Sequence, residues 1–328
     1  MPRLACFIEP RRSLEEAVRR VQVAEAAGYE SVWVTHIAAR EPLQVLAHYA
    51  HHTQRIGLGT GVVPVFLRHP ALLAMEAATL DESSGGRLSL GIGVSHRVTV
   101  EGWYGLELDD PVGRMREYTT IVRDILRTGR ADLEGKYHTS RFGLMGFEAR
   151  PDIPLLFAAL APRMLRLAGQ LADGIVLWMC SPAYIRDTVR PLLKEALVEA
   201  GRDPAAFEIV AAVPVALTED AAAARDAFRA RAMPYVHLPF YRRAIAAGGH
   251  QGDLDAFDER ATSGDMSSAL GALSDAFCDD YAGIGDQAAV RAKLEEYRAA
   301  GVTLPAVSPM GRHRGSADLE TVLEAAAG

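Results

Sequence analysis

Eight short apolar segments recur along this chain, and most of them are separated by longer amphipathic segments with helical periodicity. The apolar segments cover residues 3–8, 31–35, 56–63, 88–92, 154–159, 174–179, 208–217 and 302–307. Because strands that alternate with helices run parallel in one sheet, this order predicts an α/β fold. Eight such units in 328 residues favour a closed (β/α)8 TIM barrel.

Helix-start signals support the alternation. Ser13 and Glu16 form a capping box before an apolar helical stripe, and Ser181-Pro182 and Asp286 are further start signals. The expected helices include residues 41–53, 71–83, 113–128, 162–171 and 287–300.

Three segments interrupt the rhythm, namely 101–110, 133–152 and 234–285. The longest lies between the seventh and eighth strands and contains Gly248-Gly249 and several acids. We expect it to form helical pieces joined by loops. The sequence therefore predicts one barrel domain over residues 1–328 with an insertion at about 234–285.

Charge and cysteine content exclude several classes of protein. The net charge of −7 gives no basic surface for nucleic acid. Cys6, Cys180 and Cys278 have no CxxC spacing, which argues against a disulfide framework or a zinc site and favours a reducing cytoplasm. The chain has no long uninterrupted apolar run and no signal-peptide start, so we expect no membrane span.

Two consecutive strands end in Gly-x-Gly, at Gly59-Thr60-Gly61 and at Gly91-Ile92-Gly93. Glycine at a strand end lets a flat ligand lie against the backbone, because no Cβ intervenes. Neighbouring parallel strands end at the same edge of a barrel. The pattern therefore predicts a planar cofactor across the barrel mouth.

A set of motifs then identifies a family. They are LGTGV at 58–62, RHP at 68–70, LDESSGGR at 80–87, GIGVSHR at 91–97, VEG at 100–102, AALAPRMLRLAG at 158–169 and ADG at 172–174, with a matching segment at 285–303. In this order the motifs resemble the bacterial-luciferase-like barrel proteins, specifically the branch that uses the deazaflavin coenzyme F420. The resemblance covers nearly the whole chain.

The resemblance implies that His36 lies near the reactive edge of the cofactor ring and handles a proton, a role that suits a side chain with a pKa near neutrality. Related proteins often carry an acid just before this histidine, where this chain has Thr35. His96 occupies the position at which sugar-phosphate dehydrogenases of the family place a catalytic carboxylate. We therefore expect His36 and His96 to be catalytic and the substrate not to be a sugar phosphate.

The resemblance also implies how the cofactor is held. A non-proline cis peptide behind the ring would fall at Gly61-Val62. Free backbone N–H groups at the start of helix 162–171, together with Arg163, would bind the phosphodiester tail. The implied cofactor-binding residues are Thr35, Gly61, Val62, Pro64, Val94, Ser95, Leu160, Ala161, Arg163 and Met164.

An apolar substrate wall is expected from the end of the sixth strand and from the insertion. The expected residues are Trp178, Met179, Tyr235 and Phe240, with Tyr241 beside them in the insertion. His48, His51 and His52 lie at helical spacing, but no carboxylate completes a metal site, so we expect solvated or dimer-facing histidines and no metal.

Three functions remain open from the sequence. The first is an F420-dependent oxidoreductase that moves a hydride to or from a small organic substrate, for example by reducing a C=C or C=N bond. The second is an FMN-dependent two-component monooxygenase, and the third is a barrel that binds a flavin or metabolite without turnover. The expected partners are a second copy of the chain, through the helices after the second and third strands, and a reductase that regenerates F420 or flavin.

Overall fold

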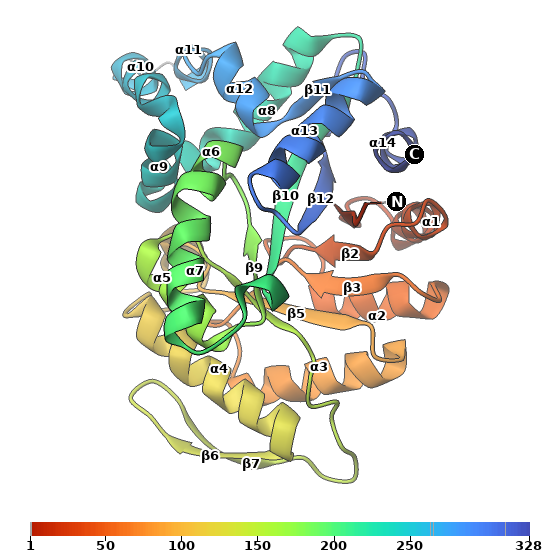
Figure 1. Cartoon of the computed structure of the whole chain (residues 1–328), viewed down its shortest axis with the longest axis vertical. Helices are drawn as coiled ribbons and strands as arrows, with labels where there is room; N and C mark the ends of the chain where they lie inside the picture. Colours follow the sequence, from red (N-terminus) through yellow and green to blue (C-terminus); the bar gives the residue numbers. More distant parts are fainter. Residues whose placement is uncertain (1, 263, 265, 312) are drawn as a thin grey trace.

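The computed structural model describes residues 2–262, 264, 266–311 and 313–328. Within these residues, eight parallel strands close into a barrel, seen near the centre of Figure 1. They are β1 (Ala5–Phe7), β2 (Ser31–Val34), β3 (Gly57–Thr60), β5 (Leu88–Gly93), β8 (Leu155–Ala158), β9 (Gly174–Leu177), β10 (Glu208–Leu217) and β12 (Leu304–Pro309). β1 pairs with both β2 and β12, and the pairing of β9 with β10 completes the ring. The predicted TIM barrel is confirmed.

Helices follow most of the strands and cover the outside of the barrel (Figure 1). They are α1 (Leu14–Ala26), α2 (Pro42–His52), α3 (Pro70–Ser84), α4 (Pro111–Thr128), α5 (Pro162–Leu171), α6 (Pro182–Tyr184), α7 (Arg190–Glu199), α13 (Gln287–Ala299) and α14 (Leu319–Ala327). The predicted start signals are used, since the side chains of Ser13, Ser181 and Asp286 accept from the first-turn amides of α1, α6 and α13. Shorter helical turns cover Val98–Trp103, Ile185–Val189 and Pro204–Ala206.

The barrel interior is filled by side chains rather than open. Its buried cluster consists of Ala5, Phe7, Trp33, Leu156, Val176, Val210, Ala212, Leu304 and Ala306. A larger apolar core lies between the strands and the surrounding helices. The interior is therefore a packed core, and the space for chemistry lies at the strand ends.

The third barrel strand is interrupted. β3 ends at Thr60, a cis peptide joins Gly61 to Val62, and the two-residue strand β4 (Val63–Pro64) continues beside β5. The sequence predicted one strand over 56–63, whereas the chain divides it into two. The non-proline cis peptide lies at the position that the resemblance implied.

The connection between β10 and β12 forms a separate helical layer, which we call the cap. It contains α8 (Ala221–Val236), α9 (Pro239–Ile245), a helical turn at Ala246–His250, α10 (Gln251–Ala261), α11 (Met266–Leu270), α12 (Asp275–Tyr281) and β11 (Gly283–Gly285). In Figure 1, α9 to α12 gather at one end of the molecule. The expected start at residue 234 is too late, because Pro234 lies inside α8.

A two-stranded antiparallel hairpin, β6 (Arg130–Glu134) and β7 (Thr139–Gly143), follows α4. It lies at the end of the molecule opposite the cap (Figure 1). The sequence indicated only a break in the barrel rhythm over 133–152. Both strands alternate exposed and less exposed positions, but an alternation of five residues in each is too short to distinguish a strand from a loop in the sequence.

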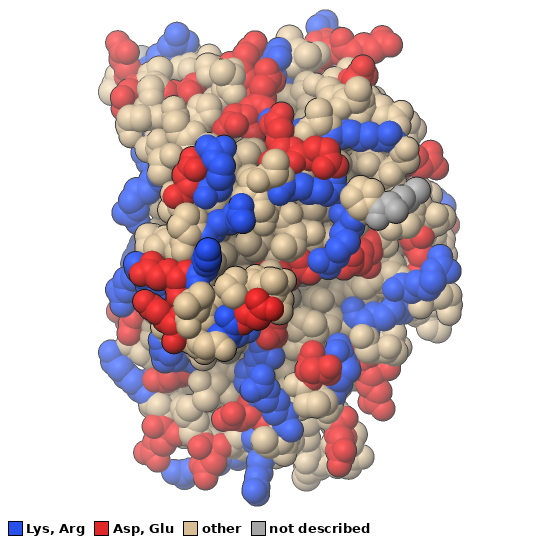
Figure 2. Space-filling view, viewed as in Figure 1, with Lys and Arg blue, Asp and Glu red and all other residues tan. Residues whose placement is uncertain are grey.

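None of the helices in the described part of the chain is long and apolar enough to cross a membrane. On the face shown in Figure 2, basic and acidic side chains are interspersed. That face offers no extended basic patch of the kind that binds nucleic acid.

Candidate active site at the carboxyl end of the barrel

The predicted site residues follow the carboxyl ends of barrel strands. His36 comes after β2, the cis peptide after β3, and His96 after β5. β3 pairs with both β2 and β5, so the strand with the cis peptide lies between the two strands that lead to the histidines. The three features therefore share one edge of the barrel, where TIM-barrel enzymes place their active sites.

His36 is half-buried, and its Nδ1 is buried without a hydrogen-bond partner among the described residues. Burial lowers the pKa of His36 below its usual 6.5, and nearby Arg68 lowers it further, while Glu41 opposes the shift. The imidazole is therefore neutral at pH 7. A buried nitrogen without a partner is a group that a ligand can satisfy.

His96 is enclosed by aromatic rings from the cap. Its ring centroid lies 5.7 Å from that of Tyr241 and 6.2 Å from that of Tyr235, both in edge-on geometry. Burial lowers the pKa of His96, so this imidazole is neutral at pH 7 as well. Tyr235 also contacts Tyr241 and Trp178, at centroid distances of 4.9 and 5.7 Å. We call these four rings the aromatic cluster.

The backbone between β5 and His96 is shaped by close contact. A Cβ added to Gly93 would lie 2.7 Å from Val62 Cγ2 and 2.9 Å from Ala158 Cβ. Glycine thus lets the end of β5 approach the cis-peptide segment and β8. Val94 and Ser95 follow, and Ser95 adopts a left-handed conformation with φ of 60°.

The start of α5 carries the predicted tail-binding group. Ala161 is the N-cap and provides no side-chain acceptor, whereas side chains cap α1 to α4. Arg163 is exposed in the first turn, Met164 is buried, and the Leu160 carbonyl accepts a 2.9 Å hydrogen bond from the Tyr184 hydroxyl. A first turn without a side-chain cap leaves amide N–H groups available to an anion.

The four predicted substrate-wall residues are not brought together as one surface. Trp178 and Tyr235 belong to the aromatic cluster. Met179 has φ of 52° and packs in the buried core of the cap.

Phe240 lies at the surface rather than at the barrel mouth. Its side chain is 53% exposed, and the guanidinium of Arg243 lies over its ring at 4.9 Å. The next residue of the same helix, Tyr241, contacts His96 instead.

Of the remaining cofactor positions, Thr35 is half-buried and donates its backbone N–H to Oε1 of Glu9 at 2.9 Å. Pro64 is buried in β4 opposite Gly93. Val62 packs against the barrel interior.

Sequence reasoning missed Glu9, which follows β1. Burial raises the pKa of Glu9, and the hydrogen bonds from Thr35 and the charges of Arg11 and Arg231 oppose that shift. A buried carboxyl with a raised pKa at a barrel mouth is a candidate proton carrier. Its position directly after a strand was the signal available in the sequence.

Sequence reasoning also missed Arg231, which lies in α8. Its guanidinium lies over the Trp178 ring at 4.7 Å, and Nη2 donates to Oγ of Ser308 at 2.7 Å. Burial lowers the pKa of Arg231 to about 10, so the side chain stays positively charged at pH 7. No periodic signal distinguishes Arg231 from the other arginines of this helix.

No group of three or more His, Cys, Asp or Glu side chains suited to a metal ion occurs among the residues that the structure describes. His48, His51 and His52 contact one another along α2, with centroid distances of 4.7 and 5.4 Å.

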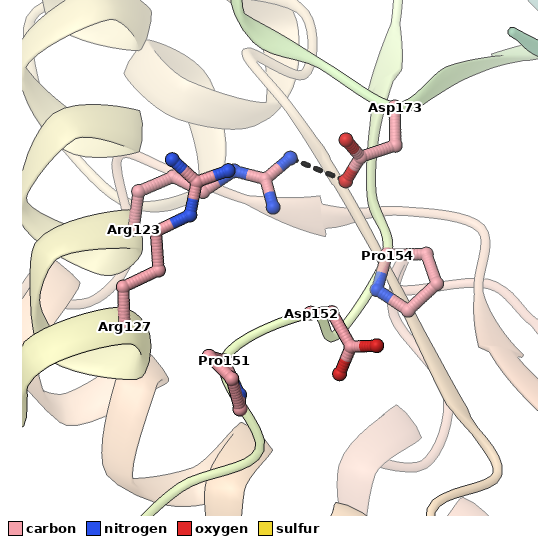
Figure 3. A pocket seen from close by; sticks show the side chains of 6 residues that line it. All are labelled: Arg123, Arg127, Pro151, Asp152, Pro154 and Asp173. Atoms are coloured by element: carbon pink, nitrogen blue, oxygen red, sulfur yellow. Dashed lines mark hydrogen bonds and ion pairs between the residues drawn. The ribbon is translucent and has the colours of Figure 1, made fainter. Parts of the chain in front are cut away.

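A pocket of about 380 Å³ lies at the amino ends of β8 and β9, whereas the groups described above follow the carboxyl ends of their strands (Figure 3). There Arg123 of α4 forms an ion pair with Asp173, which also accepts the Leu155 N–H at 2.8 Å. Asp173 therefore joins α4 to the starts of two strands, and we assign the contact to stability.

A family model described as luciferase-like monooxygenase matches residues 2–304. A putative coenzyme F420-dependent oxidoreductase of Mycobacterium tuberculosis is 32% identical over 319 residues, which cover 88% of this chain and 89% of the relative. A 5,10-methylenetetrahydromethanopterin reductase of Archaeoglobus fulgidus is 30% identical over 300 residues and covers 89% of each chain.

Solved structures show the same architecture. The coenzyme F420-dependent tetrahydromethanopterin reductase of Methanopyrus kandleri matches with a TM-score of 0.83 and 25% identity, over 99% of this chain and 97% of that one. An F420-dependent secondary alcohol dehydrogenase matches with a TM-score of 0.74 over 94% of each chain. At 19% identity, this second likeness concerns the fold alone.

Proposed function

Because this chain belongs to the luciferase-like monooxygenase family, we propose that it is an oxidoreductase that transfers a hydride between coenzyme F420 and a small organic substrate. The observation that carries the choice of cofactor is the similarity, over close to nine-tenths of the chain, to relatives named for F420-dependent reactions. Reduction of an activated C=C or C=N bond is the reaction to test first.

The residues at the mouth fit such a cofactor. Within the described part of the chain, His36 Nδ1 is a buried polar atom without a hydrogen-bond partner, and the first turn of α5 has no side-chain cap. The bound deazaflavin would supply a hydride-carrying carbon at position 5 of its ring. The first turn of α5, with Arg163, would hold the phosphodiester tail.

The protein's own contribution is orientation, proton handling and exclusion of water. His36 and His96 are neutral at pH 7, so each imidazole carries one N–H donor and one acceptor nitrogen there. The Glu9 carboxyl, with its raised pKa, is a third proton-exchanging group at the same edge. The aromatic cluster would shield the transfer from water.

Binding experiments separate the cofactors. The purified protein is titrated with F420, with the tail-less deazaflavin and with FMN, and the difference spectra are recorded. We expect F420 to bind most tightly, and Arg163→Ala to weaken F420 by about tenfold while leaving the tail-less ring unchanged, since a charge-assisted contact is worth about 1.5 kcal/mol or more. If the protein retains FMN and has no affinity for F420, the proposal is wrong and an FMN-dependent two-component monooxygenase is favoured instead.

Turnover is measured as the oxidation of reduced F420 by a panel of activated alkenes and imines. His36→Ala should lower the rate by about 10²-fold or more, as loss of a proton-transfer group does, with F420 affinity retained. F420 binding without turnover of any acceptor would instead favour a non-catalytic barrel. A reductase and a second copy of the chain remain proposed partners.

A further inference from the structure

The half-buried guanidinium of Arg231 lies at the mouth and, among the described residues, has no carboxylate beside it. Arg231 Nη2 donates to Oγ of Ser308 at 2.7 Å, and Nη1 donates to the carbonyl oxygens of Ser308 and Pro309 at 3.5 and 3.3 Å. All of these acceptors are neutral. Among the residues that the structure describes, no carboxylate lies within 4.0 Å of this guanidinium.

The other arginines of α8 make the contrast clear. Arg225 forms ion pairs with Asp275 and Asp279, and Arg229 forms ion pairs with Asp226 and Asp275. The acidic partners in these pairs have side chains that are 46–76% exposed, and a charge near water costs less to maintain. The one arginine of the three that reaches the barrel mouth is the one left without an acidic partner, although an isolated buried charge is unfavourable.

Glu9 is the acid whose charge acts on Arg231, but among the described residues it makes no direct contact with the guanidinium. It affects the pKa of Arg231 through space, but its Oε1 accepts the Thr35 N–H at the end of β2. Burial raises the pKa of Glu9, and the hydrogen bonds from Thr35 and the charges of Arg11 and Arg231 oppose that shift. Among the contacts of the described residues, Glu9 and Arg231 form no ion pair.

Resting on the proposed function, we propose that the substrate is a planar carboxylate and that Arg231 is the residue that binds its carboxylate group. A guanidinium has five N–H donors, and the protein contacts described above use at most three of them. A fork of this kind matches the two oxygens of a carboxylate.

The surroundings favour a flat molecule. The guanidinium lies on Trp178, which contacts Tyr235, and Tyr235 and Tyr241 contact His96. A continuous row of aromatic rings thus leads from the cation to an imidazole at the cofactor side. An unsaturated acid, with its carboxylate at Arg231 and its double bond along this row, matches both the charge and the shape of the surface.

The test uses trans-cinnamate and cinnamamide, which share one carbon skeleton and differ in carrying a carboxylate or a neutral amide. Each is titrated into the F420-saturated protein, and binding is followed by the deazaflavin absorbance and by calorimetry. We expect cinnamate to bind at least about tenfold more tightly than cinnamamide, as a charge-assisted bidentate contact predicts. Arg231→Met should remove this preference, and Arg231→Lys should retain part of it, because lysine keeps the charge without the planar fork.

Arg229→Met is the matched control, since it removes a guanidinium from the same helix that is already paired with acids. It should leave the preference for cinnamate unchanged. If Arg231→Met does not fold, Ser308→Ala serves instead, because it removes only the 2.7 Å contact that positions Nη2, and it should weaken cinnamate but not cinnamamide.

Equal binding of cinnamate and cinnamamide to the wild-type protein, or unchanged cinnamate binding by Arg231→Met, would overturn the inference. Its failure is distinguishable from failure of the proposed function. If F420 does not bind, calorimetry without cofactor still tests whether cinnamate binding depends on Arg231. If F420 is turned over with uncharged acceptors only, the carboxylate substrate is rejected and the F420-dependent function stands.

Discussion

Burial, more than any neighbouring charge, decides the protonation of the two histidines at the barrel mouth. It is the largest cause of the lowered pKa for His36, and for His96 no other cause contributes. Tyr235 and Tyr241 provide the rings that enclose His96. The electrostatic state of the site therefore depends on how closely the cap packs onto the barrel.

The pH profile of kcat/KM tests this dependence. Because the pKa of His96 lies below 6.5, the imidazole stays neutral until the pH falls below that value, so the acid limb should lie below pH 6.5. Tyr241→Ala admits water to the ring and should move the limb upward, toward 6.5. Met233→Ala, on the exposed face of α8, is the control and should leave the profile in place. If Tyr241→Ala leaves the acid limb of the profile at the same pH, burial by Tyr241 is not the cause of the lowered pKa of His96.

Gly93 is the second residue on which the mouth depends. Gly93→Ala places a methyl group within 3 Å of both Val62 and Ala158, so the cis-peptide segment or β8 must shift. We expect F420 affinity to fall by about tenfold or more, because a displacement of about 1 Å is costly for a positioned ligand. Gly252→Ala in α10 meets no neighbouring atom and should leave affinity unchanged, with stability equal or slightly higher. Both variants are compared by cofactor titration and thermal melting.

Among the elements, α10 and α12 of the cap are joined by one histidine between two acids. His250 Nδ1 lies 3.0 Å from Asp253 and Nε2 lies 3.1 Å from Asp280, and the ring contacts Phe277 and Tyr281. The contact with Asp280 is the largest cause that raises the pKa of His250, and Asp253 adds to it against desolvation. The protonated ring thus holds two helices of the cap together.

The stability of the cap should therefore depend on pH. Because the pKa of His250 is raised by folding, its contribution is fully present below the unfolded pKa of about 6.5 and is lost as the pH rises through the folded value. We expect the free energy of unfolding to fall between pH 6 and pH 8.5, and His250→Gln to remove this fall. Urea denaturation at the two pH values measures it. His51→Gln, an exposed histidine of α2, serves as the control; an unchanged pH dependence in His250→Gln would refute the assignment.

At the scale of the whole molecule, the motif 80–87 that helped to identify the family belongs to the end of the barrel away from the mouth. It spans the end of α3 and the turn before β5. Both oxygens of Asp81 accept from Arg150 at 2.8 Å, and Oδ1 also accepts the Leu88 N–H. The motif thus joins the end of α3, the start of β5 and Arg150 at the end of the barrel away from the histidines.

Arg150→Met should be among the more destabilising changes outside the core. It leaves the carboxylate of Asp81, whose side chain is 3% exposed, without its counter-ion. Removing one partner of a buried pair costs about 3 kcal/mol. Arg141→Met breaks an exposed pair with Glu134 and should cost about 0.5 kcal/mol or less. Chemical denaturation measures both changes. Equal losses of unfolding free energy for Arg150→Met and Arg141→Met, or a change in F420 affinity with Arg150→Met, would contradict a purely structural role for the Arg150–Asp81 pair.

The sequence was sufficient for the barrel and insufficient for parts of the site, for a physical reason. Strand and helix periodicity extends over many residues, so the eight strands and the caps of α1 and α13 could be predicted. Glu9 and Arg231 act through burial, and burial depends on which distant segments pack together. Phe240 and Tyr241 are neighbours in sequence with different surroundings, and only the direction of α9 separates them.

The entrance and exit of the cap are register partners, since Leu217 of β10 pairs with Gly285 of β11, and the Thr218 N–H donates to the Gly285 carbonyl at 2.9 Å. The first half of β10 is therefore a barrel strand paired with β9, and its last residues pair with β11 of the cap. Because its two ends meet, the cap can in principle be replaced as one segment without moving the strands of the barrel. On the proposed function, in which cap residues contact the substrate, we expect that exchanging residues 218–284 for the corresponding stretch of a relative changes the substrate and leaves F420 binding and the barrel intact.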